Sequence, residues 1–184
     1  VELNTFSCSM AAHSEHLTGL YQSIDNRVPD NGAITGFATA IKAAHDWYCN
    51  RYTTSGNPVL VMMVDARERN VFDQNAMMDA AAASCNTSFH RVTLDDAALH
   101  VDGAGVLRWR GAEVSVVYWR TGYDPSHYPE ERFWAQRRAV EASRACCCPC
   151  VGGQLAGMKA VQQRLADKKL GLVEHLLGNP VDAE

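Results

Sequence analysis

Apolar and polar residues alternate along this chain with two different periods. Short apolar runs that are bounded by turn residues indicate buried strands. The clearest of these runs is residues 58–64. Longer stretches such as residues 33–52 carry apolar side chains three and four positions apart, which indicates helices that pack by one face. Because the two kinds of segment alternate, the pattern predicts an α/β fold with three layers, α/β/α, and a mostly parallel sheet of the Rossmann-like type.

The pattern also gives approximate bounds for the individual elements. The expected strands are residues 1–5, 58–64 and 88–93, followed by a hairpin of residues 107–109 and 113–119. The expected helices are residues 13–23, 33–52, 70–85, 129–143, 154–165 and 170–177. Residues 95–100 are expected to form a short helix or a turn. No internal repeat or low-complexity linker divides the chain, so we expect a single domain.

Composition limits the class of protein. The chain has 184 residues, of which 47% are hydrophobic and 21% charged, and this is typical of one globular domain with its own core. The net charge of −4 gives no electrostatic basis for binding nucleic acid or an anionic membrane. No apolar run approaches the roughly 18 residues of a membrane-spanning helix, and no signal peptide opens the sequence. We therefore expect a cytoplasmic protein.

The cysteines are unusual because four of the seven lie within residues 146–150. An odd number of bunched cysteines favours reduced thiols over a disulfide framework. Structural zinc sites use spaced cysteine pairs together with a second, distant pair, which this sequence lacks. Neighbouring residues of a strand point to opposite faces. We therefore expect these cysteines to be buried core thiols rather than metal ligands.

Residues 68–74 place polar groups where α/β sheets bind ligands. They follow the apolar strand 58–64 and lead into the next helix, with Asn70 as its expected N-cap. The carboxyl ends of strands and the N-termini of helices both attract ligands. Glu68, Asn70 and Gln74 are the candidates, the last two sharing one helix face. A helix that is merely capped and solvated would show the same pattern.

Glu2 and Asn4 form a second polar cluster, on one face of the expected strand 1–5. A carboxylate beside an amide oxygen suits a hard cation such as Mg²⁺, which prefers oxygen ligands. Taken alone, the pair is more typical of a solvated edge strand.

A third cluster lies at the end of the expected strand 113–119. Arg120 offers a planar set of N–H donors to a carboxylate. Gly122, the residue before Tyr123, has no side chain and so lets the backbone come close to a ligand. The alternative is a surface arginine packed on Tyr123 or on Tyr128.

These clusters belong to four blocks that together resemble the eukaryotic glutathione synthetase family. The blocks are residues 1–9, VELNTFSCS; 68–74, ERNVFDQ; 118–123, YWRTGY; and 154–163, QLAGMKAVQQ. They occur in the family's order and with similar separations. The family's members are ATP-grasp ligases that join γ-glutamylcysteine to glycine through an acylphosphate. The resemblance therefore implies ATP as co-substrate, Mg²⁺ as cofactor and a homodimeric full-length enzyme.

The resemblance also implies a role for each matched residue. The residues implied to bind γ-glutamylcysteine are Ser7, Ser9, Glu68, Asn70, Gln74, Arg120 and Tyr123. Glu2 and Asn4 are implied to be Mg²⁺ ligands, and Lys159 is implied to contact the phosphates of ATP. No nucleophilic side chain is expected, because phosphoryl transfer depends mainly on positioning and electrostatics.

Finally, the resemblance implies that the chain is one part of a larger enzyme. We expect a substrate-binding domain of the pre-ATP-grasp type, with its core at residues 57–151. Residues 1–56 would supply a leading strand and helices, and residues 152–184 the start of a connection to the ATP-grasp part. The family's glycine-rich phosphate loop and third Mg²⁺ carboxylate would follow, so we expect the isolated chain to be inactive. The alternative is a non-catalytic Rossmann-like module that binds a ligand or a partner.

Overall fold

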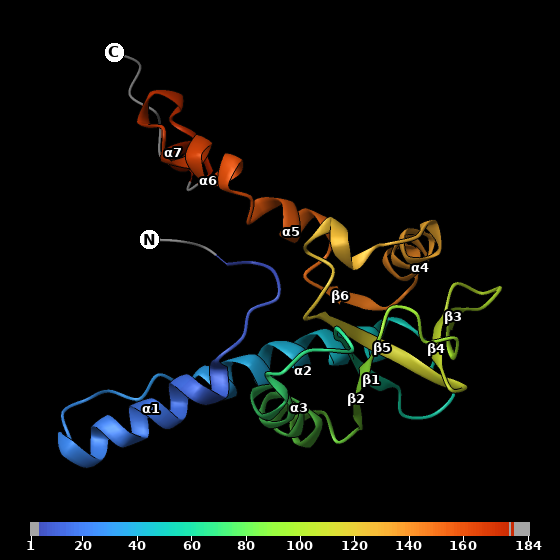
Figure 1. Cartoon of the computed structure of the whole chain (residues 1–184), viewed down its shortest axis with the longest axis horizontal. Coiled ribbons are helices and arrows are strands. Elements are labelled where there is room, and N and C mark those ends of the chain that lie inside the picture. Colours follow the sequence, from blue (N-terminus) through green and yellow to red (C-terminus); the bar gives the residue numbers. More distant parts are fainter. Residues whose placement is uncertain (1–3, 177, 179–184) are drawn as a thin grey trace.

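The sheet at the centre of the molecule is built around one long strand (Figure 1). The structure is a computed structural model that describes residues 4–176 and 178. The strands are β1 (Val59–Met63), β2 (Phe89–Val92), β3 (Leu99–Val101), β4 (Leu107–Trp109), β5 (Ala112–Trp119) and β6 (Cys146–Cys148). Their order is β2-β1-β5-β4-β3, and β6 also pairs with β5. β5 is parallel to β1 and β6 and antiparallel to β4, so it joins both parts of the sheet.

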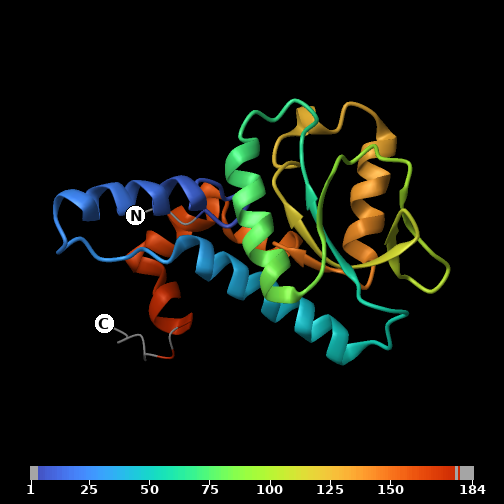
Figure 2. The same cartoon turned by 90° about the horizontal axis from the view of Figure 1, so that it is seen from below.

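Helices cover both faces of this sheet (Figure 2). α2 (Ala33–Arg51) and α3 (Val71–Cys85) pack on one face, where buried side chains of both helices meet those of β1 and β5. α4 (Glu131–Ala142) packs on the other face through Val140. The expected α/β fold with three layers and a mostly parallel core is confirmed.

The two faces are filled by alternate residues of the same strands. Leu60 and Met62 of β1 belong to the cluster under α2 and α3, whereas Val61 and Met63 belong to the cluster under α4. All of these side chains are fully buried. This is why the sequence shows a continuous apolar run at residues 58–64 rather than an alternating one.

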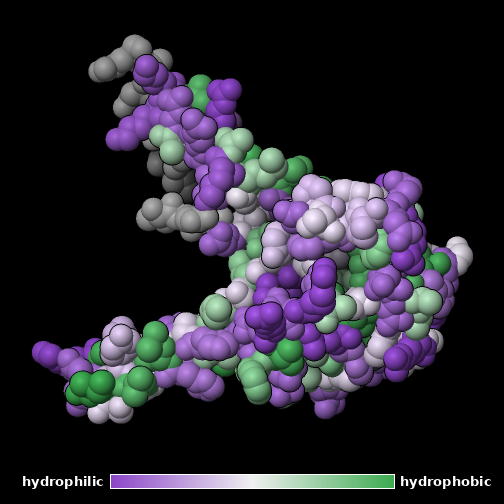
Figure 3. Space-filling model, in the orientation of Figure 1, coloured by the Kyte–Doolittle hydropathy of each residue, from purple (hydrophilic) through white to green (hydrophobic). Residues whose placement is uncertain are grey.

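The remaining helical segments are α1 (Ala11–Ile24), η1 (Pro125–His127), α5 (Val151–Ala156), α6 (Lys159–Ala166), η2 (Lys168–Leu170) and α7 (Leu172–Leu176). All of them except η1 belong to two extensions (Figure 1). α1 projects on one side and α5 to α7 on another, and the surface between them is hollowed, with hydrophilic residues at its base (Figures 1 and 3). Within the described part of the chain, no helix combines the length and apolar character needed to span a membrane.

Most of the predicted elements are confirmed, with a few exceptions. α2, α3, α4, β1, β2 and the β4–β5 hairpin lie where the sequence predicted them. The expected helix or turn at residues 95–100 is wrong in its second half, because Leu99 begins β3, which pairs with β4. The expected helix 154–165 is interrupted, since Met158 is extended (φ −67°, ψ 139°) and separates α5 from α6.

The expected strand at residues 1–5 is not seen where the structure can test it. Asn4 and Thr5 have no regular secondary structure, and residues 1–3 lie outside the described part. Thr5 instead packs against the junction of α5 and α6, where its Oγ1 donates a hydrogen bond to the carbonyl oxygen of Gly153 at 2.6 Å. The first helix also begins earlier than predicted, at Ala11.

The clustered cysteines lie mainly in β6, and all seven cysteines of the chain are free. Cys147 packs against the cluster under α4, and Cys146 and Cys148 pack against the opposite one. The prediction that neighbouring cysteines face opposite sides is therefore confirmed. These three thiols are half-buried rather than buried, and Cys150 is exposed at the start of α5, so the expectation of a core thiol is wrong for Cys150.

Candidate functional site

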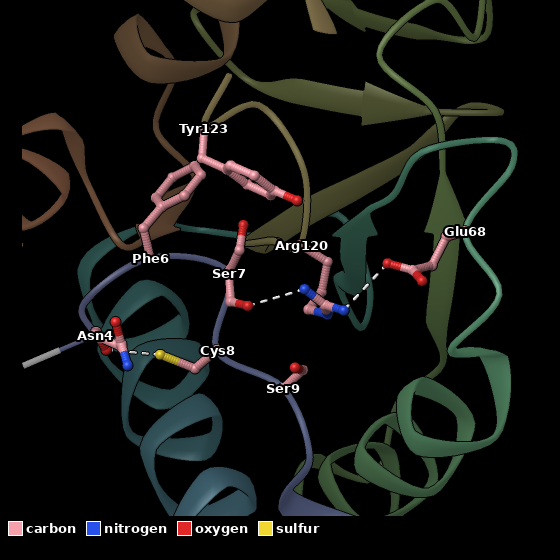
Figure 4. A pocket seen from close by; sticks show the side chains of 8 residues that line it. All are labelled: Asn4, Phe6, Ser7, Cys8, Ser9, Glu68, Arg120 and Tyr123. Carbon is pink, nitrogen blue, oxygen red and sulfur yellow. Dashed lines mark hydrogen bonds and ion pairs between the residues drawn. The ribbon is translucent and has the colours of Figure 1, made fainter.

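A pocket of about 510 Å³ opens beside the carboxyl end of β5 (Figure 4). Its wall is made by the segment before α1, by the loop between β1 and α3, and by the residues that follow β5. The lining residues are Asn4, Phe6, Ser7, Cys8, Ser9, Glu68, Arg120 and Tyr123. Three of the predicted clusters therefore contribute to one cavity, although they lie far apart in the sequence.

Arg120 is the residue that joins these segments. Its side chain is only 7% exposed, so it is not the surface arginine of the alternative interpretation. Nη1 donates to the carbonyl oxygen of Ser7 at 2.9 Å, and Nη2 donates to Oε2 of Glu68 at 3.2 Å (Figure 4). Nε is buried and has no hydrogen-bond partner among the described residues. A buried cation is costly unless it is paired, and Glu68 is the group that balances it.

The segment before α1 approaches Arg120 in a constrained conformation. Ser7 and Met10 both have positive φ, 52° and 70°, which residues other than glycine rarely adopt. Hydrogen bonds hold the segment in place: Ser7 Oγ donates to the carbonyl oxygen of Trp119 at 3.3 Å, and Tyr118 Oη donates to that of Cys8 at 2.8 Å. Such conformations persist where the surroundings enforce them, and they cluster at binding sites.

Asp73 anchors the other end of that segment, and sequence reasoning missed it. Its carboxylate is fully buried and accepts the backbone N–H groups of Met10 at 2.7 Å and Ala12 at 2.9 Å. Nδ1 of His13 lies 3.3 Å from the same carboxylate. Burial works to raise the pKa of Asp73, but these hydrogen bonds outweigh it and the pKa is lowered. An acidic residue in the first turn of α3 was the available signal.

The wall that carries Tyr123 depends on a glycine. Gly122 has φ +89°, and its carbonyl oxygen accepts a hydrogen bond from Tyr128 Oη at 2.8 Å. A Cβ at this position would lie 2.6 Å from Tyr128 Oη, so only glycine fits. Tyr123 itself is 60% exposed and meets Phe6 edge-on, with ring centroids 6.1 Å apart.

Two of the predicted dipeptide-binding residues, Asn70 and Gln74, do not line the pocket. Gln74 is fully buried, and its Oε1 accepts a hydrogen bond from Arg91 Nε at 2.8 Å, whereas its Nε2 has no partner among the described residues. Asn70 occupies the N-cap position of α3, as predicted, but its side chain makes no capping hydrogen bond. Its backbone N–H donates to Oε1 of Glu68 at 2.9 Å, so Asn70 helps to orient that carboxylate.

Of the predicted metal and ATP contacts, the two that the structure describes, Asn4 and Lys159, lie near α5 and α6. Glu2 is outside the described residues, and Asn4 is exposed at the rim of the pocket. Asn4 also lines a smaller depression of about 190 Å³ that reaches Gly157 and Met158. Lys159 follows directly, as the exposed first residue of α6. An amide oxygen such as that of Asn4 fits a hard cation, but no group of three or more His, Cys, Asp or Glu residues in the described chain could hold a metal ion.

Comparison with known proteins identifies the family. A family model described as eukaryotic glutathione synthase matches residues 58–156, which include Glu68 and Arg120. The chain belongs to the eukaryotic glutathione synthase family. Chloroplastic glutathione synthetase of Solanum lycopersicum is 34% identical over 197 residues, which cover 99% of this chain and 34% of that protein. Glutathione synthetase of Homo sapiens is 33% identical over 192 residues, covering 98% of this chain and 39% of that protein.

The alignments also show how much of a glutathione synthetase is present. The protein from Dictyostelium discoideum is 30% identical over 97% of this chain, and the aligned part is 40% of that relative. This chain therefore spans only about 34–40% of the length of the curated relatives that it matches.

Proposed function

We propose that this chain is the part of a glutathione synthetase that binds γ-glutamylcysteine. The full-length enzyme would use ATP to phosphorylate the cysteinyl carboxylate of this dipeptide, and the amine of glycine would then attack the acylphosphate. The observation that carries the proposal is the ion pair between the buried Arg120 and the partly buried Glu68, which line a pocket together with Ser7 and Ser9.

The charge pair suits the γ-glutamyl end of the dipeptide, which carries an ammonium and a carboxylate on one carbon. Glu68 would accept from the ammonium, and Arg120 would donate to a carboxylate. In the structure these two side chains neutralise each other at 3.2 Å. A zwitterionic ligand can replace this single ion pair by two, so the pocket would lose little electrostatic stabilisation when the ligand enters.

The neighbouring side chains would fix the rest of the dipeptide. Ser7 and Ser9 would hydrogen-bond its peptide backbone, and Tyr123 would cover the carboxylate region. Asn70 and Gln74 remain predicted contacts of the γ-glutamyl end, and the unpaired Nε2 of Gln74 is a donor suited to a carboxylate.

ATP and Mg²⁺ would lie on the side of Asn4. The smaller depression joins Asn4 to the residues just before Lys159, so a phosphate contacted by Lys159 would lie beside the dipeptide. Glu2 and Asn4 would hold Mg²⁺, which neutralises the charge that develops during phosphoryl transfer. We also propose that the core at residues 57–151 forms the substrate-binding domain of a homodimeric enzyme.

The cytoplasmic location is likewise a proposal. Seven free thiols suit a reducing compartment, although the relative from Solanum lycopersicum is named chloroplastic.

A conservative substitution tests the site. Within the full-length enzyme, Arg120→Lys keeps the positive charge but loses the planar fork. The loss of a hydrogen bond to a charged group costs about 1.5–3 kcal/mol, which corresponds to roughly a 10- to 150-fold loss of affinity. We expect the KM for γ-glutamylcysteine to rise at least about tenfold and the KM for ATP to stay nearly unchanged.

Arg132→Lys is the matched control, because Arg132 pairs with Glu130 at an exposed position. An unchanged dipeptide KM in Arg120→Lys would contradict the proposed site. A full-length protein that binds γ-glutamylcysteine without forming glutathione from ATP and glycine would instead support the non-catalytic binding module.

A further inference from the structure

Cys8 is the only cysteine among the residues that line the pocket, and none of the roles assigned above uses it. It is exposed and free, and it lies between Ser7 and Ser9. Its backbone is fixed by the hydrogen bond from Tyr118 Oη to its carbonyl oxygen. A free thiol is therefore held at a defined position in the wall of the pocket.

The same pocket carries a charge pair that suits a charged ligand. The Arg120 side chain is more than nine-tenths buried and lines the pocket, where Ser7 and Glu68 hold its Nη1 and Nη2. Glu68 supplies the opposite charge beside it. A γ-glutamyl group carries both complementary charges, so any molecule with that group would be concentrated next to Cys8.

Placement of the dipeptide brings its sulfur toward Cys8. With the γ-glutamyl end at Arg120 and Glu68 and ATP on the side of Asn4, as proposed above, the cysteinyl carboxylate would face Asn4. Cys8 Sγ also lies on that side, because it donates to the carbonyl oxygen of Asn4 at 2.7 Å. The ligand's own sulfur, one carbon from the cysteinyl Cα, would therefore lie along the segment that carries Cys8.

We propose that Cys8 is a site of covalent modification by disulfides of γ-glutamyl thiols, and that the resulting mixed disulfide closes the dipeptide pocket. The inference rests on the proposed function, because the pocket's recognition of the γ-glutamyl group directs the reaction.

The chemistry balances without another reactant. The thiolate of Cys8 attacks one sulfur of the incoming disulfide, a bond forms between these two sulfurs, and the original S–S bond breaks. The second sulfur leaves as a thiolate and takes up the proton that Cys8 has lost. Cys8 is oxidised, and the departing half of the disulfide is reduced. A reducing thiol reverses the reaction by the same exchange.

The reactivity of Cys8 has to come from recognition rather than from an unusually acidic thiol. Burial raises the pKa of Cys8, although a backbone hydrogen bond and the positive charge of Arg120 act in the opposite direction. Neutral disulfides should therefore react slowly near pH 7, because the thiolate is the nucleophile. A disulfide held by Arg120 and Glu68 gains from proximity instead.

The test compares two disulfides on the full-length protein. One is the disulfide of γ-glutamylcysteine and the other is hydroxyethyl disulfide, which is neutral and lacks a γ-glutamyl group. Peptide mass mapping gives the rate of adduct formation at Cys8 and at the exposed Cys150, which serves as the internal control. We expect the γ-glutamyl disulfide to react at Cys8 at least about tenfold faster than the neutral one, with no such preference at Cys150.

A thiol-free analogue, γ-glutamyl-α-aminobutyrate, should protect Cys8 and leave Cys150 unprotected. The adduct should abolish glutathione formation, and dithiothreitol should restore it. Whatever activity Cys8→Ser or Cys8→Ala retains should be insensitive to the γ-glutamyl disulfide. Equal rates with the two disulfides at Cys8, or an adduct that leaves activity unchanged, would overturn the proposal.

The proposed function and the modification of Cys8 give distinguishable results. In one outcome the protein makes glutathione and Arg120→Lys raises the dipeptide KM, but Cys8 reacts equally fast with the two disulfides. The proposed modification site is then wrong, and the proposed function stands. If Arg120→Lys leaves the dipeptide KM unchanged and the analogue protects nothing, both are wrong.

Discussion

Asp73→Asn tests how the pocket segment is held in place. The fully buried carboxylate accepts the N–H of Met10 through one oxygen and the N–H of Ala12 through the other. Asparagine has nearly the same shape but replaces one oxygen by an NH₂ donor. One of the two backbone N–H groups would then face a donor, at a place that water does not reach.

The magnitude follows from these contacts. A lost hydrogen bond to a charged group costs about 1.5–3 kcal/mol, and a buried N–H left without a partner costs about 1–3 kcal/mol. Because the two costs overlap, we expect the free energy of unfolding to fall by about 2–4 kcal/mol. For a chain of 184 residues, this lowers the Tm by roughly 4–16 °C.

Urea unfolding followed by circular dichroism measures the change. Asp79→Asn is the matched control, because Asp79 lies on the same helix and is exposed. Its effect should stay within about 0.5 kcal/mol. If Asp73→Asn were no more destabilising than Asp79→Asn, the carboxylate would not be the anchor of the segment.

The same residue predicts a pH dependence with a definite sign. The pKa of Asp73 is lowered in the folded state, below the value of about 3.9 expected for an unfolded chain. The stabilisation is therefore fully present above the unfolded pKa and is lost as the pH falls through the folded one. The stability difference between the native protein and Asp73→Asn should be constant near pH 7 and should shrink below about pH 4.

The remaining predictions concern activity, metal content and one turn. The isolated chain should form no glutathione from ATP, γ-glutamylcysteine and glycine, because it spans only about 34–40% of its relatives' length; measurable turnover by the purified chain would contradict this. The untagged protein should contain no stoichiometric zinc by elemental analysis, and serine replacements of Cys146, Cys147 and Cys148, which pack against the core, should lower the free energy of unfolding rather than the metal content. Gly122→Ala should lower the free energy of unfolding by about 1–3 kcal/mol, since φ is +89° and the new Cβ would meet Tyr128. Gly103→Ala, where a Cβ would meet nothing within 4 Å, should have a much smaller effect in the same measurement.

Much of the fold could be predicted because its signals are local. The apolar run of β1 and the helical spacing in α2 depend only on neighbouring residues, and both elements lie where they were expected. β3 could not be found in this way, because Leu99 and Val101 become strand residues only by pairing with Trp109 and Leu107. The break between α5 and α6 also depends on a distant residue, Thr5, which packs against their junction.

The candidate site was predictable in its residues but not in its contacts. Chemical type and position at strand ends singled out Glu68 and Arg120, yet nothing local shows that residues 52 positions apart form an ion pair. Gln74 was placed with Asn70 on one helix face, but α3 turns Gln74 toward the buried side, where it meets Arg91. Asp73 has a signal in the sequence as an acidic residue in the first turn of α3, but its contacts with Met10, Ala12 and His13 are with residues about 60 positions away, which no local pattern shows.

The position of β5 has a consequence for synthesis on the ribosome. β1 ends at Met63 but needs β5, which ends at Trp119, as its parallel partner. At a translation rate of about 5–20 residues per second, the ribosome completes β5 roughly 3–11 s after it completes β1. During this interval β1 and β2 form at most a two-stranded sheet with apolar faces and an open edge, which is the kind of species that chaperones shield and that otherwise aggregates. Translation that pauses between these two strands would therefore lengthen a period in which the nascent chain is prone to aggregate.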